Sequence, residues 1–138
     1  MLKFACSRFD TSDLHYRSEA DVFVNVEADL DVVDDGTVLY TKKSFPVVEL
    51  AVALRKWKSR PEADRPDFEF ESLSLEERWS LRIRRAPGGW QAVDDEGPVV
   101  RGTARPAAEI DAAIDDFALE VRAESRSMEG PWIDEFFV

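Results

Sequence analysis

Few residues in this 138-residue chain are of the types that carry enzymatic or metal chemistry. The single cysteine, Cys6, and the single histidine, His15, are the types that form a thiolate–imidazole couple. Cys6, however, falls on the apolar side of a strand predicted over residues 2–9, where a free thiol usually serves as a small core residue. These counts exclude an internal disulfide and any metal centre built from several cysteines or histidines.

Sequence motifs for catalysis or cofactor binding are also missing. The chain contains no P-loop, dinucleotide-binding fingerprint, G-x-S-x-G or H-E-x-x-H pattern. Carboxylate pairs suited to acid–base work have no specificity in a chain with 29 acidic residues. We therefore predict no catalytic residue, no metal and no cofactor.

The acidic run at residues 29–36, DLDVVDDG, invites comparison with a calcium-binding loop. In an EF-hand loop that starts at Asp29, Val33 would stand at position 5, which must supply a ligand. Tyr40 would stand at position 12 in place of the closing glutamate. The Asp-Gly step instead supplies the positive-φ positions that a tight hairpin turn needs. We interpret the run as the turn of a β-hairpin.

One neighbourhood combines basic and aromatic residues, namely Arg78, Trp79, Arg82, Arg84, Arg85 and Trp90. Nucleic-acid binding would require these side chains to line an exposed groove. We favour the interpretation in which the arginines balance Glu69 and Glu71 while the tryptophans fill the core.

The charge distribution argues against nucleic acid and anionic membranes as partners. The formal net charge is −11, and residues 92–138 alone carry 12 acidic and 4 basic residues. A duplex or an anionic membrane would repel such a surface. A basic protein would be attracted by it, although a solvated face that only keeps the chain soluble explains the acidity equally well.

The acidic residues concentrate on a helix predicted from Pro106 to about Arg126. Ile110, Phe117 and Val121 belong to its narrow apolar stripe, and acidic residues occupy most of the remaining surface. One apolar residue departs from this pattern, because helical periodicity turns Leu119 toward the acidic side. An apolar anchor ringed by charge is typical of protein interfaces. The candidate partner-binding residues are therefore Glu109, Asp111, Asp115, Asp116, Leu119 and Glu120.

Hydrophobic periodicity predicts an α+β fold over a single domain, residues 1–138. The predicted fold is an antiparallel sheet of about five to seven strands with two helices packed on one face. The predicted strands cover residues 2–9, 20–30, 37–41, 67–71, 78–84, 90–93 and 98–101, and the predicted helices cover 46–59 and 106–126.

Charge and hydrophobic pattern select one register for a hairpin of the strands 67–71 and 78–84. That register places Phe68 opposite Ile83 and Phe70 opposite Leu81, with Asp67 facing Arg84 and Glu69 facing Arg82. A slip by one residue would bury arginine.

The C-terminal segment, residues 127–138, ends in an apolar tail, residues 132–138, which is too apolar to be left in water without cost. It either docks on the domain or binds a partner, and one hypothesis is a homo-oligomer that hides the tail between subunits. The amino terminus lacks a secretory signal, and no stretch is long enough for a membrane span. A lone thiol suits a reducing compartment, so we predict a cytoplasmic protein, monomeric or homodimeric.

Several segments carry a resemblance to known proteins: residues 45–51, FPVVELA, followed by Leu54 and Trp57, then residues 68–72 and the Gly89-Trp90 step. With these segments the chain resembles a group of small, uncharacterised bacterial proteins, mainly actinobacterial. The resemblance covers most of the chain and implies a single domain without implying an activity. In size, acidity and element order the chain also resembles immunity proteins of bacterial toxin systems.

These observations favour a non-enzymatic, acidic protein-binding module. Our leading hypothesis is an immunity protein or inhibitor whose acidic C-terminal third covers a basic toxin or nuclease. The alternative is a small-ligand-binding or enzymatic domain of unknown substrate, with a pocket between sheet and helices.

Overall fold

The structure is a computed structural model that describes residues 1–72, 81–94 and 99–137. In chain order its elements are β1 (Leu2–Asp10), α1 (Glu19–Asn25), β2 (Glu27–Asp34), β3 (Thr37–Pro46), α2 (Val47–Lys58), the 3-10 turn η1 (Glu62–Asp64), β4 (Leu81–Ala86), β5 (Gly89–Asp94), β6 (Val100–Arg101), α3 (Ala107–Glu129) and the 3-10 turn η2 (Pro131–Phe137). The predicted α+β class is confirmed.

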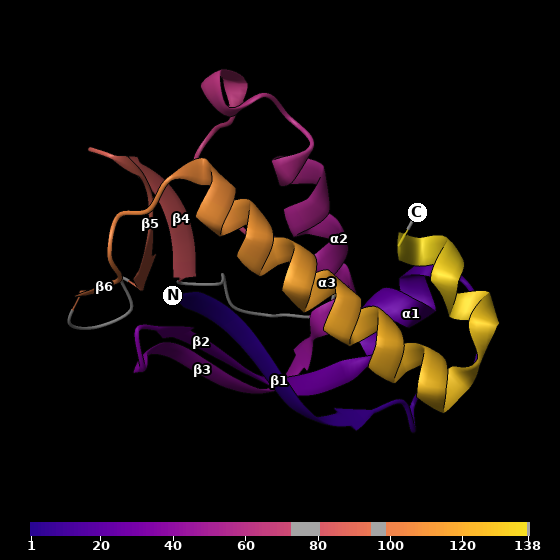
Figure 1. Ribbon diagram of the computed structural model, residues 1–138. Coiled ribbons are helices and arrows are strands. Elements are labelled where there is room, and N and C mark those ends of the chain that lie inside the picture. Colours follow the sequence, from indigo (N-terminus) through magenta and orange to yellow (C-terminus); the bar gives the residue numbers. More distant parts are fainter. Residues whose placement is uncertain (73–80, 95–98, 138) are drawn as a thin grey trace.

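The strands that the structure describes form two antiparallel sheets of three strands each, instead of the single sheet of five to seven strands that we predicted. Sheet A has the order β1-β2-β3 and sheet B the order β4-β5-β6 (Figure 1). The division arises because β3 leads directly into α2 at Pro46, so the chain leaves sheet A and starts new pairing beyond the helix.

The predicted hairpin turn joins β2 to β3. Asp35 and Gly36 both have positive φ, 47° and 81°, which matches the right-handed twist of the flanking strands. Asp34 pairs with Thr37 across the turn. The acidic run 29–36 is thus the end of a strand and its turn, as its Asp-Gly step indicated.

The strand predicted over residues 20–30 is wrong in its first half, where the structure has helix α1. Ser18 caps this helix, and its hydroxyl accepts a hydrogen bond from the Asp21 amide. Val22 and Val26 are both fully buried, at a spacing of four residues that suits one face of a helix as well as alternation in a strand. The hydrogen-bonded N-cap at Ser18 therefore favours the helix over the strand.

The predicted helix 46–59 is found as α2, and the hairpin of 67–71 with 78–84 is found only in part. Phe68 forms an isolated bridge with Ile83 in the predicted register. The main partner of β4 is β5, across the turn before Gly89. Residues 73–80 lie outside the described part of the chain, so the first three residues of the second predicted strand are not tested, and residues 81–84 are found in β4.

Helices α2 and α3 lie side by side and cover one face of sheet A (Figure 1). The predicted apolar stripe of α3 is confirmed, because Ile110, Phe117 and Val121 are buried. The rings of Phe4 on β1 and Phe117 lie 5.4 Å apart. Sheet A therefore depends on the C-terminal helix to keep water from its apolar face.

Residues 102–105, which we call the strap, connect the two sheets. In the strap the Arg105 amide and carbonyl pair with those of Trp90 on β5, at 2.7 and 2.8 Å. Toward sheet A, the Thr103 amide donates to the buried Asp34 carboxylate at 2.7 Å, and the Arg105 guanidinium pairs with the same carboxylate. One acidic side chain thus ties the strap to the end of β2.

The helices within the described residues include none that combines the length and apolar character of a membrane span. The C-terminal tail docks on its own chain, since Ile133 and Phe137 are buried and η2 packs against α3 and α2.

Candidate functional site

The five acidic candidates on α3 lie on two sides of the sixth, Leu119. Asp111 and Asp115 lie toward α2, whereas Glu109, Asp116 and Glu120 lie toward β1.

On the side toward α2, the acidic residues are engaged in ion pairs within the fold. Asp111 accepts two hydrogen bonds, of 2.8 and 3.1 Å, from the buried Arg65, whose guanidinium also lies over the Trp57 ring. Asp115 pairs with Lys58 at 3.0 Å. Because its charge is matched at close range, Asp111 holds α3 to the segment after α2 and offers little to a partner.

On the side toward β1, acidic residues line a groove. Two adjoining pockets of about 380 and 300 Å³ share Met1, Leu2, Ala113 and Asp116. We call their union the β1–α3 groove. Glu109, Asp116 and Glu120 line it from α3, Leu2 and Ala113 are part of its apolar lining, and the cationic side chains of Lys3 and Arg105 also line it.

The acids of this groove differ in their partners. Glu109 lies 3.5 Å from Arg105, one turn earlier on the chain. Within the described residues, neither Asp116 nor Glu120 forms an ion pair. Their charges therefore remain available to a cation brought into the groove.

Leu119 has the exposure that the sequence predicted. Its exposed fraction is 64%, which is high for a leucine in the middle of a helix. Asp115 and Asp116 flank it on the surface, because helical periodicity places them on either side of residue 119. Leu119 thus separates the two sides of α3.

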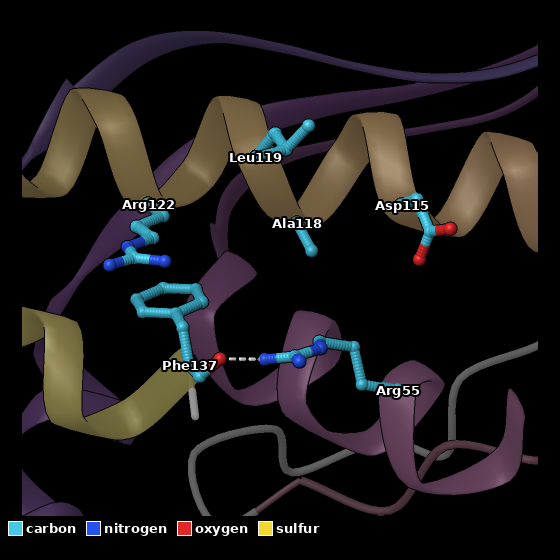
Figure 2. Close-up of a pocket in the computed structure, with 6 residues that line it drawn as sticks. All are labelled: Arg55, Asp115, Ala118, Leu119, Arg122 and Phe137. Atoms are coloured by element: carbon cyan, nitrogen blue, oxygen red, sulfur yellow. Dashed lines mark hydrogen bonds between the residues drawn. The ribbon is translucent and has the colours of Figure 1, made fainter. Parts of the chain in front are cut away.

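A further pocket, of about 310 Å³, lies between α2, α3 and η2 (Figure 2). Its lining consists of Arg55, Asp115, Ala118, Leu119, Arg122 and Phe137. Arg55 donates a hydrogen bond to the Phe137 carbonyl, and Arg122 donates to Asp134 at 3.0 Å. We call this the arginine pocket.

Asp134 connects the arginine pocket to the docked tail. The hydrogen bond from Arg122 lowers the pKa of Asp134, and the charges of Arg122 and Arg126 act in the same direction. The carboxylate therefore stays ionised at neutral pH and holds η2 to α3; this contribution fades as the pH falls through the lowered pKa.

Among the hydrogen bonds of the described residues, none joins Cys6 to His15. The exposed His15 donates its backbone N–H to Asp21 at the start of α1. Burial raises the pKa of the Cys6 thiol to about 12, with a smaller contribution from the charge of Glu120. Cys6 packs against the core, as its position on the strand predicted.

This raised pKa predicts an inert thiol. At pH 8 the folded protein should react with Ellman's reagent more than about 100-fold more slowly than the urea-unfolded chain, because the reactive thiolate is scarce at a pKa of about 12. Absorbance at the reagent's thiolate band follows both reactions. Equal rates would show that Cys6 is neither buried nor protonated.

In the basic and aromatic neighbourhood, the described residues have structural roles. Trp90 is fully buried against Trp57, with ring centroids 5.0 Å apart, and Arg85 lies over its ring. Arg82 lies 3.5 Å from Glu69, as predicted. Arg78 and Trp79 lie outside the described residues. Arg82 therefore balances an acidic side chain, and Trp90 fills the core, as we predicted from the sequence.

The sequence did not predict the arginine pocket. Arg55, Arg122 and Phe137 come from three separate elements, and each has an ordinary local context. Of these three residues, the sequence pattern singled out only Phe137, as part of the apolar tail.

Comparison with known proteins assigns a family. Residues 2–93, from β1 to β5, match the domain of unknown function DUF7878. No curated protein and no solved structure matches the chain. The β1 wall of the β1–α3 groove lies within the matched segment, and its α3 wall and the strap lie outside it. Because the match spans well over half of its residues, the chain belongs to the DUF7878 family.

Proposed function

We propose that this protein is a non-enzymatic binding module that holds a basic protein through the β1–α3 groove. The observation that carries the proposal is the pair Asp116 and Glu120, which lack ion-pair partners within the described residues and line a groove that is partly apolar. A lysine or arginine side chain laid along the groove would bring its charge to these carboxylates and its methylenes to Leu2.

The exposed Leu119 supplies an apolar contact beside the groove. Burying one leucine side chain contributes roughly 1.5–3 kcal/mol. The acidic side chains around Leu119 attract a basic partner before contact. The association rate should therefore be high at low salt and should fall as the salt concentration rises. Charge therefore sets the rate of encounter, and Leu119 helps to retain the complex.

Among basic proteins, the proposed partner is a toxin or nuclease that this chain neutralises, as immunity proteins do. The acidity that repels a duplex would let the chain cover the phosphate-binding surface of a nuclease. The first candidate partner to test is a basic protein encoded by a neighbouring gene.

The test is a binding measurement with that purified gene product by surface plasmon resonance, which gives the association rate, the dissociation rate and Kd, at low and physiological salt. We expect a D116K/E120K double variant to bind at least about tenfold more weakly than the wild type, because two close charge pairs become repulsive. Leu119→Ala should raise the dissociation rate more than it lowers the association rate.

A matched control separates the groove from net charge. An E62K/D64K variant changes the net charge by the same amount on the exposed η1 turn, which carries no groove residue. If both double variants weaken binding equally, only total charge matters and the groove assignment is wrong. If the wild type does not bind the neighbouring gene product, the inhibitor proposal is rejected.

A further inference from the structure

The arginine pocket contains hydrogen-bond donors that the fold does not use. A guanidinium has five N–H groups. Within the described residues, Arg55 uses one of them on the Phe137 carbonyl and Arg122 uses one on Asp134. The remaining donors of two side chains, from α2 and α3, border the same pocket of about 310 Å³.

The charge balance of the pocket differs from that of the whole chain. The charged side chains that line it are Arg55, Asp115 and Arg122, and the ion-pair partners of the last two are Lys58 and Asp134. These five groups carry three positive and two negative charges, in a protein of net charge −11. An anion that the rest of the surface repels would find its counter-charge here.

The remaining walls of the pocket are apolar. The buried Ala118 and Phe137 lie on opposite walls, and Leu119 completes the lining. Figure 2 shows the Arg122 guanidinium beside the Phe137 ring and the Arg55 guanidinium beside the Phe137 carbonyl. A few polar groups set in an apolar wall are the usual composition of a small-molecule site.

We propose that the arginine pocket binds a small organic carboxylate with an apolar body. The planar guanidinium fork matches the two oxygens of a carboxylate, which here would lie between Arg55 and Arg122. The apolar body would rest on Ala118 and Phe137. This pocket shares no lining residue with the β1–α3 groove, and its proposed ligand contacts, Arg55, Ala118, Arg122 and Phe137, take no part in the proposed function. The two proposals can therefore fail independently.

The experiment uses phenylacetate as the probe and phenylacetamide, its uncharged analogue, as the ligand control. Titrations are followed by ¹⁵N NMR, including the side-chain Nε–H signals of arginine. We expect saturable binding of phenylacetate, a shift of the Arg122 signal, and weaker binding of phenylacetamide. Arg122→Gln should weaken phenylacetate binding about tenfold, the effect of one charge-assisted hydrogen bond.

The matched control variant is Arg126→Gln. Arg126 lies one turn further along α3 and pairs with the same Asp134, but it does not line the pocket. Its loss should change phenylacetate affinity less than about twofold. The proposal is overturned if phenylacetate does not bind at millimolar concentration, if phenylacetamide binds equally well, or if both arginine variants weaken binding alike.

Discussion

Asp34→Ala should destabilise the protein by about 3–5 kcal/mol, the cost of removing one partner from a buried ion pair. The carboxylate is 3% exposed and accepts hydrogen bonds from the Thr103 amide and the Arg105 guanidinium. The hydrogen bond that the Arg105 guanidinium donates to Asp34 is also the main cause of the raised pKa of Arg105. Without the Asp34 carboxylate, the Thr103 amide and the Nε–H of Arg105 lose their acceptor between the two sheets, and among the described residues only Asp35 and Glu109 remain to pair with the guanidinium. Urea unfolding followed by tryptophan fluorescence measures the loss.

The matched control is the next residue along the chain. Asp35 also contacts Arg105, at 2.9 Å, but its side chain is 61% exposed. Asp35→Asn removes the charge and keeps a residue type that tolerates the positive φ of 47° at this turn position. It should therefore cost less than about 1 kcal/mol, because water replaces an exposed ion pair. Equal effects of the two substitutions would mean that the strap is not held by Asp34.

Gly89→Ala should be at least as damaging as a large-to-small change in the core, at about 3 kcal/mol or more. Gly89 has φ of 137°, a conformation that essentially only glycine adopts. A β-carbon there would also clash with the carbonyl oxygen of Arg105, which is backbone and cannot turn aside. The bridge between Trp90 and the strap would have to open.

A substitution at the neighbouring glycine separates the cost of the positive φ from the cost of the steric clash with Arg105. Gly88 has φ of 88°, and a β-carbon there would meet no atom within 4 Å. Gly88→Ala should therefore cost only the backbone term, about 1–2 kcal/mol. Thermal unfolding of both variants gives the comparison, and a Gly89 variant no worse than the Gly88 variant would contradict the close approach of the strap.

The elements that the sequence predicted well are those specified by short-range pattern. The stripe of Ile110, Phe117 and Val121 repeats at the period of a helix, and every member is buried. The Asp-Gly step specified the hairpin turn through backbone conformation alone. Where two periods fit the same residues, as with Val22 and Val26, the cap at Ser18 was the stronger signal and the alternation misled.

The division into two sheets and the roles of the α3 acids depend on long-range partners. Asp111 looks like any solvated helix acid until Arg65 is placed beside it, 46 residues away in sequence. Exposure of Leu119 followed from periodicity, whereas pairing of Asp115 with Lys58 required the packing of α3 on α2. The periodicity of the sequence therefore predicted which side chains of the helix are buried and which are exposed. It could not predict the tertiary contacts that each exposed side chain makes.

The packing of Phe117 against Phe4 has a consequence during translation. At ordinary elongation rates, on the order of ten seconds separate the emergence of β1 from the ribosome and that of the middle of α3. During that interval α2 can cover its part of sheet A, but the apolar side chains of β1 that pack on α3, Phe4 among them, remain exposed to water. A premature stop codon ahead of residue 117 should therefore yield a product that aggregates or is degraded rather than a smaller working protein.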